Sequence, residues 1–180
     1  MVKKVLMSLA ALCLTSNLFS EECNLSHKIL YGIALTEKHS KRDTGYPFLI
    51  SFNNYSDFLR VKTDLKDLGM IILDNRTIDC KDKSTCSAVT EYLVKNNIVN
   101  IDLGAFQHCY KWNTYAFDDY FDLEKSYMKT CQIVSEEVKN HGFTWKAISR
   151  YHNVYDKYNV PYSQKLQKNI LKAYPELAMN

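Results

Sequence analysis

Hydrophobic residues recur at three- and four-residue steps along most of the chain, a spacing typical of amphipathic helices. The first such stretch runs from Leu25 to Glu37, with Ser26 placed to cap its start. Five more helices are expected: one from Ser56 to a stop at Gly69, a short one ending near Asn96, one from Asp122 to Lys139, one from Thr144, and one after Pro161. In the second helix the expected inward positions are Phe58, Leu59, Leu65 and Leu68.

Two short apolar runs have the composition of strands instead. Pro47–Phe52 is one, and Met70–Leu73 is the other, ended by the turn residues Asp74 and Asn75. The pattern as a whole predicts a mainly α-helical fold with a small β insertion. The length of 180 residues fits one domain, expected to span residues 21–180.

Residues 1–20 differ in character from the rest of the chain. Lys3 and Lys4 precede an apolar run from Val5 to Leu14, and a short polar exit ends at Ser20. This arrangement is that of a secretory signal peptide, and its apolar run is too short to cross a bilayer. We therefore expect an exported protein without an integral membrane segment.

Charge and composition narrow the function further. The net charge is +3, and because the leader takes Lys3 and Lys4 with it, 21 of the 23 basic residues remain beside 20 acidic ones. This nearly equal number of basic and acidic residues argues against a protein that binds nucleic acid mainly by neutralising its phosphates. The 13 Tyr, 8 Phe and 2 Trp residues provide rings for a core and for stacking on sugars.

Export makes disulfides the expected state of the cysteines. Five cysteines remain after the leader, and only five residues separate Cys80 from Cys86, so we expect a local bridge between these two. Cys23 then pairs with either Cys109 or Cys131, and the sequence leaves both choices open. No cysteine pair has CxxC spacing and no histidine pair accompanies the cysteines, so no metal site is predicted.

Glu37 lies on the apolar stripe of the first predicted helix. It follows Ile33 by four residues and Leu30 by seven, so its carboxyl group faces the core or a cleft cut into it. Loss of water at such a place favours the protonated carboxyl group, which is the form that a general acid needs.

Three segments occur in an order that resembles a known family. They are Ala34-Leu-Thr-Glu37, Asn100-Ile-Asp-Leu-Gly-Ala-Phe-Gln107 and Ala147-Ile-Ser-Arg-Tyr-His-Asn153. They are similar to the three motifs of lytic transglycosylases of the goose-lysozyme-like superfamily, in the small group associated with secretion machinery. The Tyr46-Pro47 step and the strand after it also resemble an insertion in one branch of that group. The resemblance implies a lysozyme-like fold with a catalytic Glu37.

The resemblance also implies roles for residues of the second and third motifs. By this resemblance Gln107 lines the wall of the cleft and contacts substrate or orients the acid. The Tyr151 hydroxyl is expected to lie near Glu37. Phe106 is either a core ring or a platform for a sugar, while His152 and Asn153 line the same cleft. Two departures from the family pattern concern the polar partners of the acid: Lys38 stands where Ser is usual, and His108-Cys109 stands where Ile-Asn is common.

The reaction implied by the resemblance needs one carboxyl group, whereas glycosidases in general use two. The acid protonates the oxygen between N-acetylmuramic acid and N-acetylglucosamine, and the C6 hydroxyl of the muramoyl residue then closes a 1,6-anhydro ring. No metal or organic cofactor takes part. The next acid along the chain, Asp43, lies in a polar loop and is expected to be solvated.

The expected partners are the glycan strands of peptidoglycan in a Gram-negative periplasm, together with components of a secretion or pilus apparatus. Two other functions stay open: a muramidase that uses water on the same fold, and a non-catalytic wall-binding assembly factor.

Overall fold

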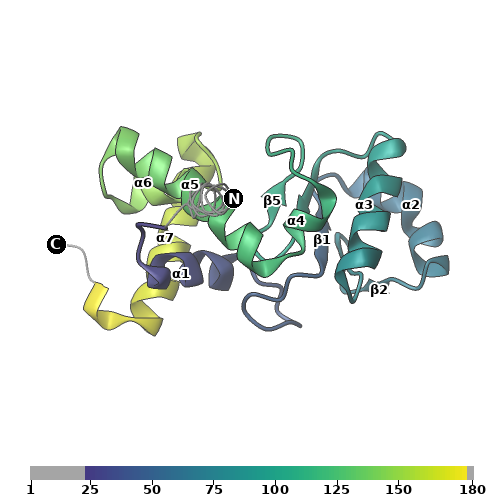
Figure 1. Cartoon of the computed structure of the whole chain (residues 1–180), viewed down its shortest axis with the longest axis horizontal. Coiled ribbons are helices and arrows are strands. Elements are labelled where there is room, and N and C mark those ends of the chain that lie inside the picture. Colours follow the sequence, from purple (N-terminus) through teal and green to yellow (C-terminus); the bar gives the residue numbers. More distant parts are fainter. Residues whose placement is uncertain (1–22, 178–180) are drawn as a thin grey trace, which may run out of the picture.

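The computed structural model describes residues 23–177. Figure 1 shows two lobes side by side along the long axis. We call the group formed by the first helix and the last three helices the helical lobe, and the sheet with the three helices that lie between these in sequence the sheet lobe. Each lobe has its own cluster of buried apolar side chains. The fold is mainly α-helical, as the sequence predicts. The expected signal peptide over residues 1–20 lies outside the described residues.

The sheet has five antiparallel strands in the order β2-β3-β1-β4-β5. The strands are β1 (Leu49–Phe52), β2 (Ile71–Ile72), β3 (Thr77–Asp79), β4 (Ile101–Leu103) and β5 (His108–Cys109). Ile50 is paired with Ile78 and with Leu103, and all three side chains are buried in the core of the sheet lobe. Successive residues of a strand point to opposite faces of the sheet, so the residues next to these three lie on the other face.

That opposite face carries a polar row across four strands. Ser51 of β1 is paired with Thr77 on one side and with Asp102 on the other, and Asp102 is paired with Cys109. Residues directly opposite each other in an antiparallel pair share a face of the sheet. The row places one carboxyl group, Asp102, on β4, which has a neighbouring strand on each side.

The helical lobe is built around α1, whose stripe of Ile29, Leu30 and Ile33 is buried. Its start is capped as expected, because the Ser26 hydroxyl accepts a hydrogen bond from the backbone N–H of Lys28. The other helices of this lobe pack around that stripe. The helices of the lobe are α1 (His27–Glu37), α5 (Leu123–His141), α6 (Trp145–Ser149) and α7 (Asp156–Ala173), and a 3₁₀ turn, η1 (Pro175–Leu177), follows.

The helices of the sheet lobe are α2 (Tyr55–Asp67), α3 (Lys83–Lys95) and α4 (Phe117–Tyr120). The prediction for the inward face of α2 was half right. Phe58 and Leu65 are buried, but Leu59 and Leu68 are about half exposed. Val61 takes an inward position instead, because α2 packs against the sheet along the stripe formed by Phe58, Val61 and Leu65.

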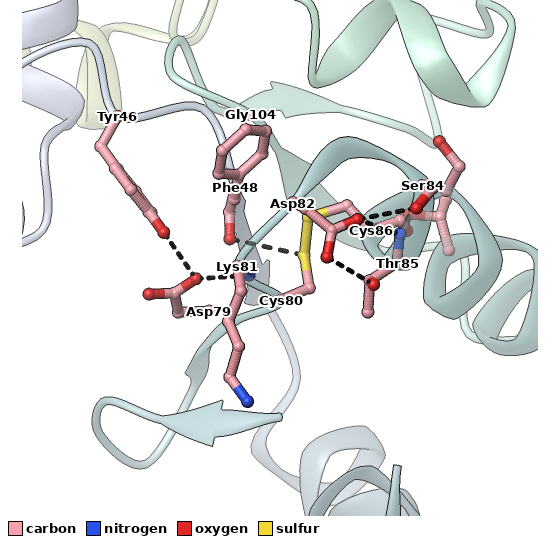
Figure 2. The surroundings of a disulfide bond; sticks show 12 residues. Tyr46, Phe48, Asp79, Cys80, Lys81, Asp82, Ser84, Thr85, Cys86 and Gly104 are labelled. Atoms are coloured by element: carbon pink, nitrogen blue, oxygen red, sulfur yellow. Dashed lines mark hydrogen bonds between the residues drawn. A yellow bond between two sulfur atoms is a disulfide. The ribbon is translucent and has the colours of Figure 1, made fainter. Parts of the chain in front are cut away.

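Two disulfides fasten the chain. Cys80, directly after β3, is bonded to Cys86 in the first turn of α3, which confirms the predicted local bridge (Figure 2). Cys23 is bonded to Cys131 of α5, which decides between the two partners left open by the sequence. Cys109 is the free cysteine among those that the structure describes.

The start of α3 is capped beside its disulfide. The Asp82 carboxylate accepts hydrogen bonds from the backbone N–H of Thr85 and from the hydroxyl groups of Thr85 and Ser84, at 2.8–2.9 Å (Figure 2). These bonds, led by the Thr85 N–H, lower the pKa of Asp82 to about 2.

The loop between α1 and β1 is tied to the sheet by a buried carboxylate. Asp79, 1% exposed, accepts hydrogen bonds from the Arg42 guanidinium, the Tyr46 hydroxyl and the backbone N–H of Lys81. Figure 2 shows the Tyr46 hydroxyl pointing at Asp79 beside the disulfide. The loop that follows Glu37 is therefore fixed to the sheet lobe, while Glu37 itself belongs to the helical lobe.

Candidate active site

Glu37 is the last residue of α1, at the end of the helix that meets the sheet lobe (Figure 1). Its side chain is only 14% exposed, as expected from its place on the apolar stripe. The His152 imidazole lies close to it, with Nδ1 3.7 Å from Glu37 Oε1. His152 lies three residues after the end of α6, and its side chain is 45% exposed.

Tyr162 of α7 packs against His152. Its ring stacks on His152 with centroids 4.2 Å apart and ring planes 3° from parallel. The Tyr162 hydroxyl is buried and has no hydrogen-bond partner at ordinary distance. Burial, followed by the negative charge of Glu37, raises the pKa of Tyr162 well above its usual value of 10. Tyr162 is therefore a neutral hydrogen-bond donor close to the Glu37 carboxyl group.

Tyr151 and His108 contact each other, and the charge of Glu37 affects the pKa of both. The Tyr151 hydroxyl donates a hydrogen bond of 2.5 Å to the Phe106 carbonyl, and the ring makes an edge contact with His108. Burial and then the charge of Glu37 raise the pKa of Tyr151 well above 10. The Tyr151 hydroxyl gives its proton to a backbone carbonyl, so the expectation that it holds the Glu37 carboxyl group stays a prediction.

Asp102 of β4 contributes a second carboxyl group. Its side chain is 19% exposed and accepts a hydrogen bond of 2.9 Å from the Asn53 amide, with the Arg76 guanidinium 3.8 Å away. Burial raises the pKa of Asp102, and the negative charge of Glu37 adds to the rise against the opposing effects of Asn53 and Arg76. The charge of Glu37 in the helical lobe thus adds to the raised pKa of Asp102 in the sheet lobe.

Of the remaining predicted site residues, Gln107 and Asn153 hydrogen-bond the local backbone. Gln107 lies in the left-handed region at φ 51°, and its amide donates to the Gly104 carbonyl at 2.8 Å. The Asn153 carboxamide oxygen accepts from the backbone N–H of Tyr155 at 2.9 Å, at the start of α7. Both side chains are partly exposed, and these hydrogen bonds stabilise turns of the backbone.

The interpretation of Phe106 as a sugar platform is corrected. Its side chain is 2% exposed and belongs to the core of the helical lobe, where it contacts the rings of Tyr127 and His108. A ring enclosed in this way has no free face for a sugar. Phe106 acts at the site through its backbone carbonyl, which holds the Tyr151 hydroxyl.

Sequence reasoning missed Asp102, Tyr162 and His108 as site residues. Asp102 had a signal, since a single acid between Ile101 and Leu103 in a short strand must leave the apolar face. Tyr162 had none, because its place four residues before Leu166 is equally that of a core ring. Part of the candidate site therefore lies on α7. The sequence predicts this helix to begin only after Pro161, but it begins at Asp156.

His108 makes the stability of the site dependent on pH. The ring is 2% exposed, with Nε2 3.2 Å from the Ser126 carbonyl and from the Thr130 hydroxyl, while Nδ1 is buried without a partner. Burial lowers the pKa of His108 from 6.5 to about 4, against the opposing effects of the Ser126 carbonyl and Glu37.

We expect the free energy of unfolding to fall as the pH decreases from 6.5 to 4. In this range the unfolded chain binds a proton at His108 and the folded chain does not, so the folded state loses about 3 kcal/mol in total. Urea unfolding at several pH values checks this, with His108→Gln as the variant. The variant should have a flatter dependence between pH 4 and 6.5; an unchanged slope would assign the acid sensitivity to other groups.

Residues 23–177 contain no group of three or more His, Cys, Asp or Glu side chains placed to hold a metal ion. Within the same range no helix is long and apolar enough to span a membrane.

The structure thus defines a disulfide-bonded, mainly α-helical protein with a small antiparallel sheet and a shielded glutamate at the junction of two lobes. Two disulfides are typical of chains that fold outside the reducing cytoplasm. Comparisons with protein-family models, curated proteins and solved structures give no match to this chain.

Proposed function

We propose that this chain is an exported peptidoglycan lytic transglycosylase with Glu37 as its general acid and base. The observation that supports this most is the setting of the Glu37 carboxyl group. It ends a helix, is 14% exposed, and its charge reaches buried groups of β4, β5 and α7. A shielded carboxyl group among neutral phenols at the meeting of two lobes is suited to proton transfer.

In the proposed reaction the protonated Glu37 gives its proton to the glycosidic oxygen between N-acetylmuramic acid and N-acetylglucosamine. The bond from the muramoyl C1 to that oxygen breaks, and the oxygen leaves as the free hydroxyl of N-acetylglucosamine. The muramoyl O6 then bonds to C1, and the Glu37 carboxylate takes the proton from O6. This restores the acid, so one carboxyl group and no co-reactant complete the cycle.

The neighbouring phenols suit both halves of this cycle. Phenols with a pKa of 10 are already neutral at physiological pH, and the pKa values of Tyr151 and Tyr162 are raised above that. The unpartnered Tyr162 hydroxyl is available to donate a hydrogen bond to Glu37 when the carboxyl group is ionised. That bond would stabilise the state in which Glu37 acts as the base.

We further propose that the two lobes form a lysozyme-like fold with the glycan strand bound between them, and that the enzyme opens the wall locally for a secretion or pilus apparatus. The motif order and the position of Glu37 support the first part. The second part rests on the family resemblance alone.

Digestion of purified peptidoglycan sacculi with the mature protein tests the proposal. Mass spectrometry of the released muropeptides should find 1,6-anhydromuramoyl ends, which are one water lighter than hydrolytic products. Reducing ends would instead identify a muramidase. No release over the time in which a known muramidase clears the same sacculi would identify a wall-binding factor without catalysis.

A hydrolytic muramidase on the same fold is the second candidate, and Asp102 is the observation that favours it. Hydrolysis needs a second carboxyl group to activate water or to act as the nucleophile. Asp102 is electrostatically coupled to Glu37, and its pKa is raised rather than lowered. A solvated Asp43 is not needed for this role.

Asp102→Asn separates the two reactions. For the transglycosylase we expect the release of anhydro-muropeptides to stay within about tenfold of the unmodified protein, since this change removes no acid or base step. The Asn carboxamide oxygen still accepts the bond from Asn53, so the sheet is preserved. A loss of about a hundredfold or more, with reducing ends as the products of the unmodified protein, would favour hydrolysis.

A further inference from the structure

Two side chains of α7 bind the last turn of α1. The Lys165 ammonium group donates a hydrogen bond of 2.7 Å to the Thr36 carbonyl, and the Asn169 amide donates one of 3.1 Å to the Thr36 hydroxyl. Thr36 is 2% exposed, and its hydroxyl in turn donates to the Gly32 carbonyl at 2.8 Å. The residue directly before Glu37 is therefore held through both its backbone and its side chain by another helix.

The bond from Lys165 supplies a hydrogen-bond donor that the C-terminal end of α1 lacks. The last four carbonyl groups of a helix have no partner within it, and a cation near them is stabilised by the helix dipole. The last turn of α1 contains no basic residue. Lys165, more than one hundred residues further along the chain, supplies the missing donor and the positive charge.

Backbone packing brings α7 close enough for these contacts. Gly32 of α1 faces Ile170 of α7, and a Cβ atom at Gly32 would lie 2.0 Å from Ile170 Cγ1. Only a residue without a side chain allows this approach. On α7, Tyr162, Lys165 and Asn169 follow at steps of three and four residues, so one face of the helix meets both Glu37 and the residue before it.

We propose that Lys165 and Asn169 are positioning residues for Glu37, and this inference rests on the function proposed above. They act through Thr36: they fix the turn from which Glu37 projects and so fix the direction of its carboxyl group toward the sugar. Without them the last turn of α1 frays, as helix ends do when their carbonyl groups lack partners. Glu37 then spends less time in the productive geometry, while the surfaces that bind the glycan are unchanged.

The test compares the kinetics of anhydro-muropeptide release by Lys165→Met, Lys165→Arg and Lys168→Met. Lys168 lies one turn further on α7, is exposed, and loses the same charge on substitution, so it is the matched control. For Lys165→Met we expect kcat to fall by about 10- to 100-fold with KM within about threefold. Lys165→Arg should restore most of kcat, because a guanidinium can donate to the same carbonyl.

Hydrogen exchange of the backbone amides of residues 36 and 37 gives a readout independent of activity. Exchange should be about tenfold faster in Lys165→Met than in Lys168→Met. An unchanged kcat in Lys165→Met, or equal losses in Lys165→Met and Lys168→Met, would overturn the inference. If the unmodified protein releases no product, the proposed function fails, and unchanged exchange in Lys165→Met would then overturn the role of Lys165 separately.

Discussion

Glu37→Gln is expected to lower the release of anhydro-muropeptides by about a thousandfold or more, within the range that general acid–base catalysis contributes. The amide has the volume of the carboxyl group and occupies the same 14% exposed position, but it has no acidic proton for the glycosidic oxygen. It also cannot accept the proton of the C6 hydroxyl. The measurement is the initial rate of product release from sacculi, followed by mass spectrometry.

The matched control for this variant is Glu91→Gln. Glu91 lies on α3, has a side chain 54% exposed, and pairs with Lys95 on the same helix, so its change should leave the rate unaltered. Thermal unfolding of both variants should resemble that of the unmodified protein. A Glu37→Gln variant with a near-normal rate and a normal fold would move the acid elsewhere, and Asp102 would be the first carboxyl group to examine.

Gly104→Ala is expected to reduce the free energy of unfolding by about 4 kcal/mol or more, a large part of the stability of a typical domain. Gly104 has φ +78°, and a Cβ atom there would lie 2.0 Å from the backbone carbonyl oxygen of Tyr120. The substitution therefore combines backbone strain with a collision against a rigid group in the core of the sheet lobe. Urea unfolding monitored by circular dichroism measures the loss.

Gly69→Ala provides the comparison that isolates the collision. Gly69 has the same φ of +78°, but a Cβ atom there would meet nothing within 4 Å. We expect Gly69→Ala to cost only about 1–2 kcal/mol, the strain of the left-handed conformation alone. Equal losses in the two variants would show that the turn at Gly104 relaxes away from Tyr120.

Much of the helical lobe could be predicted from the sequence, because its information is local. The stripe of α1, its cap at Ser26 and its end at Glu37 follow from residues within four positions of one another. α5 was predicted within two residues of its ends for the same reason. Cys80 and Cys86 were paired correctly since only a short loop separates them.

The sheet and the start of α7 could not be predicted in the same way. β3, β4 and β5 have two or three residues each, too few to show an alternating pattern, and their pairing joins segments far apart in the chain. α7 begins at Asp156 and contains Pro161, which the sequence favours as a start. α6 ends at Ser149, before Tyr151, because the chain turns there to bring His152 over Glu37.

The candidate site divides along the same line. Glu37 is predicted from its own helix, whereas the residues around it come from β4, β5 and α7 and depend on how these elements meet. Asp102 belongs to the candidate site because the sheet register turns it away from the apolar face. Tyr162 belongs to it because α7 packs against α1. No short window of the sequence contains either fact.

The disulfide between Cys23 and Cys131 has a consequence for the opposite end of α1. Cys23 precedes the helix by a few residues and joins it covalently to α5, while Lys165 and Asn169 hold its far end. Both ends of α1 are therefore tied to other helices, the first to α5 and the second to α7. A displacement of the Glu37 carboxyl group along α1 would therefore have to move α5 and α7 as well.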